Sequence, residues 1–251
     1  MQKPSATHLL IIPTYNTGKL VINVVSEALK VWQPIWVVID GSDDGSAELL
    51  EELALSEPQL TLLKHPYNRG KGAAIYTAIQ AALSQGYTHI LTMDADGQHP
   101  SHAINTFMAK SQQYPESVIL GRPLFADDAP ALRVNGRKVS NFWANLETLW
   151  LGINDSLFGF RVYPLKPLKK VMDSTQFARR FDFDPEVAVR LVWQGINPIN
   201  IDVPVRYLSP EQGGISQFRY LRDNSLLTWM HIRLFLGFIP YLPALIKRRF
   251  F

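Results

Sequence analysis

The sequence predicts an α/β fold in which helices flank a mainly parallel sheet. Short apolar runs of strand length alternate with longer stretches of helical period through the first half of the chain. Polar or Gly-rich segments follow several of those runs, where sheets of this class bind ligands. With 251 residues, 47% of them hydrophobic, the chain is long enough for one large domain or two small ones.

The individual elements follow from hydrophobic periodicity. In the first half we expect strands at 8–14, 35–40, 60–64, 88–93 and 118–120, with helices at 18–32, 46–55 and 72–84. In the second half we expect helices at 134–151 and 185–194, strands at 156–163 and 200–205, and loops at 124–133 and 209–216.

Composition excludes several classes of protein. A net charge of +3 gives no nucleic-acid-binding footprint, so we expect no nucleic-acid partner. The chain has no cysteine, which excludes disulfides and thiolate metal sites and fits a reducing compartment. Residues 1–8 are polar and lack the apolar run of a secretory signal, so we expect a cytoplasmic location.

Asp94 and Asp96 give the sharpest chemical signal. They follow an apolar strand, and carboxylates at i and i+2 of an extended segment point the same way. Oxygen ligands in this arrangement suit Mg²⁺ or Mn²⁺ completed by substrate phosphates. One Asp could instead cap the helix expected near Ser101. The pair, followed by Gly97, Gln98 and His99, favours a metal site.

Two further segments follow strand ends. Asp40 can accept hydrogen bonds from a base or a ribose, whereas Asp43, Asp44 and Ser46 are interpreted as caps of the next helix. Lys71 lies in a Gly-rich segment, 68–72, at a helix N-terminus, which favours an anion. A tightly packed start of an Ala-rich helix explains that segment equally well.

The ordered set of segments resembles the family 2 glycosyltransferases, which share the GT-A fold, and in particular their lipid-directed branch. The resemblance extends over residues 8–216. It is carried by Pro13-Thr14-Tyr15-Asn16, Asp40-Gly41-Ser42, Asn68-Arg69-Gly70-Lys71-Gly72, Asp94-Ala95-Asp96-Gly97-Gln98-His99-Pro100, Gly121-Arg122, Asp155 with Gly159-Phe160-Arg161, and Phe183-Asp184-Pro185-Glu186.

The resemblance implies an inverting transfer of a hexose from a nucleotide-diphosphate sugar, with Mg²⁺ or Mn²⁺ as cofactor. It implies a glycosyltransferase domain at 1–224, with a Rossmann-like nucleotide-binding half to about 121 and an acceptor half at 122–224. Implied donor ligands are Pro13, Tyr15, Asp40, Lys71, Asp94 and Gln98; metal ligands are Asp94 and Asp96; phosphate or acceptor ligands are Arg122, Arg133 and Arg137.

The acceptor is expected to be lipid-linked, either a polyprenyl phosphate or a lipid hydroxyl. A phosphate is already anionic, but a hydroxyl needs a general base. In addition to Asp96, the candidate catalytic acids are Asp155, Asp184 and Glu186. Glu186 could instead pair with Arg190, and Asp184 could instead cap a helix. The late loop at 211–217 lacks the basic residues that the polyprenyl-phosphate branch carries there.

The C-terminal segment, 225–251, is expected to be amphipathic and to lie on a membrane. Its longest uncharged run, 234–246, has 13 residues by the sequence and holds two prolines, whereas a spanning helix needs about 20. Basic residues Lys247, Arg248 and Arg249 follow, beside aromatics, which suits the surface of an anionic leaflet. We therefore expect a peripheral protein on the inner face of the cell membrane; a helix packed on the domain is the alternative.

Two other functions compete with this interpretation. A nucleotidyltransferase also pairs a nucleotide with Mg²⁺, but usually opens with a Gly-rich basic loop, unlike residues 13–16 here. A non-catalytic sugar-nucleotide or lipid-binding scaffold would not need the intact Asp40, Asp94 and Asp96.

Overall fold

A seven-stranded sheet organises the molecule, with strand order β3-β2-β1-β4-β6-β5-β7. The computed structural model describes residues 3–125, 131–205 and 219–251, except for the side chains of 131–134. The strands are β1 (His8–Thr14), β2 (Ile35–Asp40), β3 (Leu60–His65), β4 (His89–Thr92), β5 (Val118–Phe125), β6 (Arg161–Pro164) and β7 (Pro198–Val205). Within this sheet only β6 is antiparallel to its neighbours, β4 and β5.

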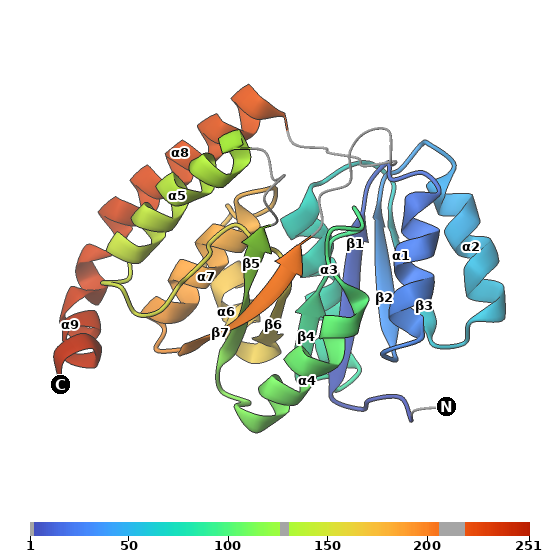
Figure 1. Ribbon diagram of the computed structural model, residues 1–251, viewed down its shortest axis with the longest axis horizontal. Helices are drawn as coiled ribbons and strands as arrows, with labels where there is room; N and C mark the ends of the chain where they lie inside the picture. The colour runs from blue at the N-terminus through green and yellow to red at the C-terminus, as the bar shows by residue number, and fades with distance from the viewer. Residues whose placement is uncertain (1–2, 126–130, 206–218) are drawn as a thin grey trace.

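Helices cover both faces of the sheet (Figure 1). They are α1 (Leu20–Leu29), α2 (Ser46–Ser56), α3 (Lys71–Ser84), α4 (Ile104–Gln113), α5 (Ala131–Leu146), α6 (Leu165–Asp173), α7 (Phe183–Trp193), α8 (Tyr220–Gly237) and α9 (Leu242–Phe250). Alternate residues of β1 enter two cores: Leu9 and Ile11 pack toward α3, whereas Leu10 and Ile12 pack toward α1. This is the alternation expected of a strand buried on both faces.

The predicted α/β fold with a mainly parallel sheet is confirmed, and the elements of the first half lie close to their predicted positions. The predicted strand at 156–163 is wrong over its first residues, because β6 begins only at Arg161. Asp155 holds the preceding segment in a turn, since its Oδ1 accepts the backbone N–H groups of Leu157 at 2.9 Å and Phe158 at 2.7 Å. The predicted loop at 209–216 lies outside the described residues, as do residues 126–130 of the loop predicted at 124–133. The two ends of that second loop were predicted wrongly, because 124–125 belong to β5 and 131–133 to α5.

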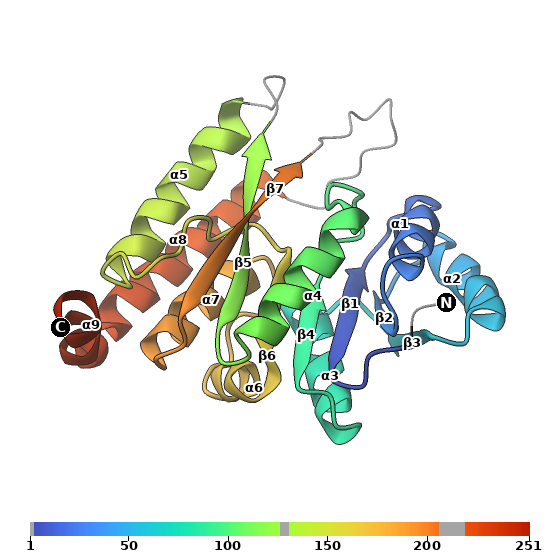
Figure 2. The ribbon, with the colours of Figure 1, turned by 60° about the horizontal axis from the view of Figure 1, so that its bottom comes forward.

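Helices α5 and α8 lie side by side beyond the β7 edge of the sheet, and α9 follows at the far end of the molecule (Figures 1 and 2). Helix α8 begins at Tyr220, so the boundary predicted at 224 falls inside it. No single helix of the described chain meets the length and hydropathy of a membrane span; α8 and the segment Ile239–Phe250 meet them only together, with a bend of 46° between them.

Candidate active site

A large cavity of about 1150 Å³ opens where β1, β2 and β4 end and continues between α5 and α8. Nine of the residues predicted to form a site line it: Pro13, Tyr15, Asp40, Lys71, Asp94, Asp96, Gln98, Arg137 and Asp184. The predicted polar segments come together because the carboxyl ends of parallel strands meet at one edge of a sheet. The cavity therefore has a polar end on the sheet and a second end on the α5–α8 pair.

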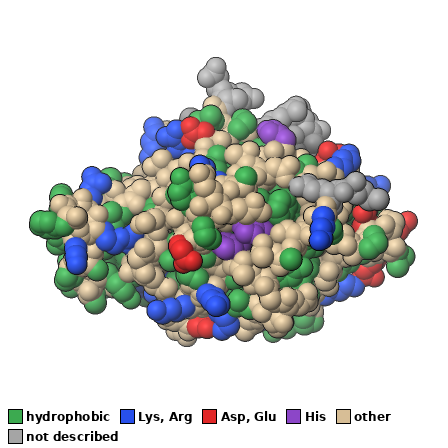
Figure 3. All heavy atoms as spheres, turned by 90° about the horizontal axis from the view of Figure 1, so that it is seen from below, with side chains coloured by type: hydrophobic (Ala, Val, Ile, Leu, Met, Phe, Trp, Pro, Cys, Tyr) green, Lys and Arg blue, Asp and Glu red, His purple; other side chains and the backbone are tan. Residues whose placement is uncertain are grey.

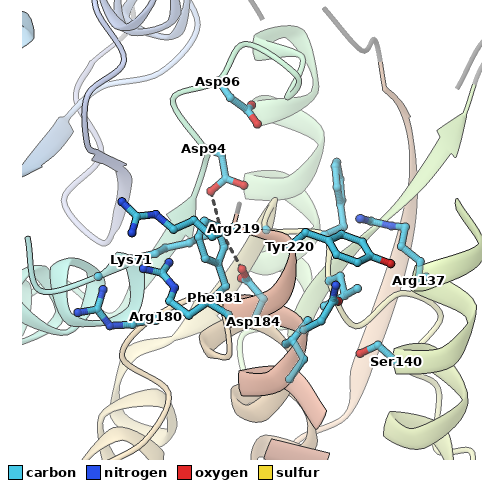
Figure 4. A pocket seen from close by; sticks show the side chains of 18 of the residues that line it. Lys71, Asp94, Asp96, Arg137, Ser140, Arg180, Phe181, Asp184, Arg219 and Tyr220 are labelled. Carbon is cyan, nitrogen blue, oxygen red and sulfur yellow. Dashed lines mark hydrogen bonds and ion pairs between the residues drawn. The ribbon is translucent and has the colours of Figure 1, made fainter. Parts of the chain in front are cut away.

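The polar end is built around Lys71, whose ammonium lies between two acids (Figure 4). Its Nζ is 2.6 Å from Oδ1 of Asp94 and 2.7 Å from Oδ2 of Asp184. Burial alone would lower the pKa of Lys71, but the charges of Asp184 and Asp94 outweigh that effect and raise it. The pKa of Asp94 is correspondingly lowered: burial raises it, and Lys71 and then His99 lower it further than burial raises it.

Asp94 and Asp96 lie in a turn that is fixed from below by His99. The backbone N–H of Asp94 donates to Nδ1 of His99 at 2.9 Å, and the ring packs edge-on against Phe158 at 4.7 Å between ring centres. Burial lowers the pKa of His99 to about 4, so the imidazole is neutral near pH 7. Oδ1 of Asp96 accepts the backbone N–H of Gln98 at 3.0 Å. His99 thus supports the turn, and the two carboxylates remain at the cavity wall.

The donor atoms at this end fit a divalent cation. Asp94, Asp96 and Gln98 offer hard oxygen ligands, and Asp94 already binds the Lys71 ammonium. Oδ1 of Asp184 is buried and has no hydrogen-bond partner among the described residues. That part of the chain contains no cluster of three or more acids or histidines that could hold a metal. A Mg²⁺ or Mn²⁺ ion here would need oxygen atoms from water or substrate, as is usual for Mg²⁺.

Asp40 ties the β2 end to the Gly-rich segment. Its Oδ1 is 2.7 Å from Nδ1 of His65 and accepts the N–H of Arg69 at 2.9 Å, and its Oδ2 accepts the N–H of Gly70 at 2.7 Å. Asp40 lines the cavity, but only 3% of its surface is exposed. Its first role is therefore to hold the segment that carries Lys71.

Packing accounts for the glycines of that segment. A Cβ at Gly72 would lie 2.1 Å from the carbonyl oxygen of Ala178, so only glycine permits this contact at the start of α3. The N–H of Ala73 donates to the carbonyl of Arg179 at 3.0 Å. The structural interpretation of the glycines is thus supported, while Lys71 beside them contacts carboxylates rather than the helix end.

Arginine side chains from α5 and from the segments before α7 and α8 line the cavity. Arg137 of α5 is held by Asp155, with Nε 3.1 Å from Oδ2. Arg180, which contacts Asn68 at 3.2 Å, and Arg219 also line the cavity (Figure 4). Sequence reasoning missed Arg180, because it does not follow a strand end and no local motif marks it.

Three predicted residues are not brought into this cavity, and a fourth has a side chain that the structure does not describe. Arg122 is exposed and pairs with Asp202 on the neighbouring strand, with Nε 2.5 Å from Oδ1. Asp155 is buried behind Arg137. Glu186 is fully buried and pairs with Arg190 and Arg233, each at 2.9 Å. The side chain of Arg133 lies outside the described residues. Arg122 and Glu186 are therefore not positioned to contact a ligand in this cavity, because each forms ion pairs with other residues.

The second end of the cavity combines apolar side chains with polar ones such as Ser140 and His231. Its apolar part is formed by Val139 and Trp143 of α5 with Leu227, Ile232 and Phe235 of α8, and the rings of Trp143 and Phe235 pack edge-on at 5.8 Å between their centres. Further exposed apolar side chains lie on α5 and α8 and on the segments that follow them: Phe142, Trp150, Trp229, Ile239, Phe250 and Phe251. Exposed apolar side chains that gather on one face are typical of a ligand-, protein- or membrane-binding surface.

Comparisons with known proteins show which family the chain matches. Residues 9–179, more than half of the chain, match the family model described as "Glycosyl transferase family 2". Polyprenol monophosphomannose synthase of Mycolicibacterium smegmatis is 28% identical over 218 residues, covering 84% of this chain and 81% of the relative. A UDP-N-acetylglucosamine–dolichyl-phosphate N-acetylglucosaminyltransferase of Methanococcus voltae is 28% identical over 223 residues, covering 80% of this chain and 86% of the relative.

Solved structures show the same fold. Glucosyl-3-phosphoglycerate synthase of Mycobacterium tuberculosis, crystallised with Mn²⁺, UDP and glucosyl-3-phosphoglycerate, gives a TM-score of 0.63 at 15% identity, over 93% of this chain and 80% of that one. TarS of S. aureus with UDP-GlcNAc gives 0.57 at 14% identity, over 89% and 65%. The fold and the site define a GT-A glycosyltransferase. The chain belongs to glycosyl transferase family 2.

Proposed function

We propose that this chain transfers a hexose, with inversion, from a nucleotide-diphosphate sugar to a lipid-linked acceptor at the cytoplasmic face of a membrane. The observation that carries the proposal is the two-ended cavity. Acids and cations that suit a metal–diphosphate group lie at the sheet end, and apolar side chains lie at the α5–α8 end. A substrate pair of one charged nucleotide and one apolar acceptor matches this division.

The donor is assigned to the sheet end. Pro13, Tyr15 and Asp40 would border the nucleotide, and Asp94, Asp96 and Gln98 would hold Mg²⁺ or Mn²⁺ against the diphosphate. Such an ion would neutralise the negative charge that builds on the leaving group. The Lys71 ammonium adds a fixed positive charge beside Asp94, and Arg180 and Arg219 are available for phosphate oxygens.

The reaction is displacement at the anomeric carbon. The acceptor oxygen forms a bond to that carbon while the bond to the diphosphate oxygen breaks, which inverts the configuration. Of the acids proposed as a base, Asp184 lines the cavity, whereas Asp155 and Glu186 lie behind it. Asp155 is assigned to positioning Arg137.

The acceptor is assigned to the α5–α8 end. Two relatives are named for lipid phosphates, polyprenol monophosphomannose and dolichyl phosphate. The apolar wall formed by Trp143, Leu227 and Phe235 suits a hydrocarbon chain. The exposed apolar residues of α8 and α9, with Lys247 and Arg249 nearby, would rest on an anionic leaflet. The polar and apolar ends of the cavity would then face water and lipid respectively.

The metal ligands provide the direct test. The double variant Asp94→Asn, Asp96→Asn should lose about 100- to 1000-fold or more in turnover, because removing one such electrostatic contributor costs that much. Donor screening with Mn²⁺ would identify the nucleotide and sugar, and calorimetry with UDP and GDP would measure binding. Asp202→Asn, an exposed surface acid, is the matched control.

Full turnover in the double variant would contradict the metal assignment. Absence of binding of either nucleotide to the parent protein would contradict the transferase function itself. Binding of nucleotide without sugar transfer would favour a scaffold, and transfer of a nucleotidyl group would favour a nucleotidyltransferase.

A further inference from the structure

A hydrogen-bonded series of polar side chains lies in the wall of the apolar end. Nε2 of His231 on α8 is 2.9 Å from Oγ of Ser140 on α5, and Nδ1 is 3.0 Å from Oε1 of Glu147. Ser140 and His231 line the cavity, whereas Glu147 is fully buried behind them. A hydroxyl, an imidazole and a carboxylate connected in this order can move a proton.

The fold alone gives no reason for a carboxylate at this position. Burial of an acid costs free energy unless all its oxygens are hydrogen-bonded, and Oε2 of Glu147 has no partner among the described residues. Burial raises the pKa of Glu147, and the neighbouring His231 opposes that rise. A buried acid that lowers the stability of the fold and lies next to a cavity is a candidate functional residue.

The series continues to Ser156 and Asn141. Oγ of Ser140 is 3.0 Å from Oγ of Ser156, whose hydroxyl is 2.8 Å from Oδ1 of Asn141. When Nε2 of His231 is protonated, it donates to Ser140, Ser140 donates to Ser156, and Ser156 donates to Asn141. When Nε2 is unprotonated, Ser156 donates to Ser140 and Ser140 donates to Nε2.

Both directions leave the groups satisfied. Oδ1 of Asn141 also accepts the backbone N–H of Ser156 at 2.7 Å, and this bond persists in either direction. His231 can therefore accept a proton delivered from outside the series through Ser140, and two hydroxyl groups reorient with no displacement of heavy atoms. Glu147 stabilises the imidazolium that results.

Ser140 is not placed to act as a covalent nucleophile. It lies inside α5, where the backbone N–H groups are used by the helix. Acyl transfer needs N–H donors aimed at the developing oxyanion, and the helix around Ser140 offers none from its backbone. The arrangement favours proton transfer over formation of an ester on Ser140.

The acids closer to the sheet are already neutralised. Asp184 pairs with Lys71, Asp155 with Arg137, and Glu186 with Arg190 and Arg233. In the described wall of the cavity, His231 and Ser140 thus form a base whose acid partner is not shared with a lysine or arginine. A phosphate acceptor needs no base, whereas a hydroxyl acceptor does.

We propose that the acceptor is an apolar alcohol and that Ser140 and His231 receive its hydroxyl proton. This proposal rests on the proposed function and names the acceptor class for it. The acceptor oxygen bonds to the anomeric carbon, and the electron pair of the breaking bond leaves with the nucleoside diphosphate. The acceptor proton passes to Oγ of Ser140 while the proton of Ser140 passes to Nε2 of His231. Glu147 is a positioning residue.

The charges around His231 come from two helices and a turn. Glu147 faces it from the turn directly after α5. Glu186 of α7 raises the pKa of Glu147 after burial, and its own charge is offset by Arg190 of α7 and Arg233 of α8. A pH profile of the relay therefore reports on His231 together with Glu147.

The test compares two acceptors with the same hydrocarbon chain, farnesol and farnesyl phosphate, using the donor that supports turnover. The parent should glycosylate farnesol in preference to the phosphate. His231→Ala should lose about 100-fold or more in kcat, the usual contribution of a general base, with an unchanged KM for the donor, and added imidazole should restore part of that kcat. Glu147→Gln should shift the acidic limb of the pH–kcat profile.

Several outcomes would overturn the relay while leaving the proposed function intact. These are preference for farnesyl phosphate, an unchanged kcat in His231→Ala, or loss without imidazole rescue in a variant that melts and binds nucleotide like the parent. Labelling of Ser140 by a fluorophosphonate would instead indicate a covalent nucleophile. Failure of the parent to bind any nucleotide would contradict the proposed function, and the relay with it.

Discussion

At the residue scale, the site depends on how closely three chain segments approach one another. Gly159 precedes β6 and lies against the Lys71–Asp94 pair: a Cβ there would be 2.4 Å from Nζ of Lys71 and 2.9 Å from Oδ2 of Asp94. The absence of a side chain at this one position lets the ammonium and the carboxylate meet. The electrostatics of the polar end thus rest on a residue that carries no charge.

Replacement of Gly159 by Ala should therefore impair activity more than stability. The added methyl group must displace the Lys71 ammonium, so we expect a fall in kcat/KM of about tenfold or more, the equivalent of about 1.4 kcal/mol, with a small change in melting temperature. Gly237→Ala is the control, because its Cβ would meet Trp193 at an ordinary 3.8 Å. Equal kinetics in Gly159→Ala and the control would show that this contact does not matter.

The sequence predicted the site residues that follow strand ends and missed those brought in by packing. Asp40 and Asp94 were predictable because the end of a parallel strand fixes where the next side chains lie. Arg180 and Ser140 depend on how the segment before α7 and the α5–α8 pair pack on the sheet, which no local pattern records. Lys71 was predicted as an anion ligand, but its position beside two acids is set by residues distant in sequence.

At the element scale, periodicity predicted longer helices better than short ones. Helix α6 was missed although Leu165, Leu168 and Val171 recur at helical spacing, because it has only 9 residues and contains Pro167. The antiparallel direction of β6 was also beyond periodicity, since strand direction follows from the connection rather than the residues. The C-terminal segment was predicted as amphipathic, and the structure divides it into α8 and α9.

Helix α9 combines anchoring to the domain with an exposed basic surface. Leu245 is buried, Tyr241 stacks on Trp193 at 4.7 Å, and Arg248 donates to the carbonyl of Val192 at 2.5 Å. Lys247 and Arg249 are exposed, and Figure 3 shows basic and apolar side chains next to one another at the end of the molecule where α9 lies. Removal of the whole segment would expose the core around Trp193, so charge substitution is the sharper test of membrane binding.

The double variant Lys247→Glu, Arg249→Glu should bind anionic vesicles more weakly than the parent. Each basic residue near such a surface contributes about 1 kcal/mol, so the partition coefficient should fall at least tenfold, measured by vesicle sedimentation. Lys30→Glu is the control: Lys30 is exposed beside Glu27 at the end of α1, a helix that lies at the other end of the molecule from α9 (Figure 1). Equal sedimentation of the parent with neutral and anionic vesicles would contradict an electrostatic role for α9.

At the scale of the whole molecule, stability should depend on pH through histidines that fold in the neutral form. Burial, and then the neighbouring His89, lowers the pKa of His8 from 6.5 to about 4, and burial lowers that of His99 to about 4. Between these values the unfolded chain binds more protons than the folded one, so stability rises with pH. The lowered pKa of Asp94 affects stability only at pH values below this range. The pKa values of Glu147 and Asp182 are raised, first by burial, so these two acids make stability fall with pH where the histidines make it rise.

Because these effects oppose one another, the contribution of one histidine is measured as the difference between the pH dependence of a variant's stability and that of the parent. His8→Gln should reduce the slope of unfolding free energy against pH by about 1.4 kcal/mol per unit between pH 4.5 and 6, the contribution of one proton. Urea denaturation at a series of pH values measures the slope. The exposed His102→Gln should leave it unchanged. An equal slope in His8→Gln and the parent would mean that His8 is protonated in the folded protein, and its stacking on His89 at 4.4 Å would then need a different electrostatic explanation.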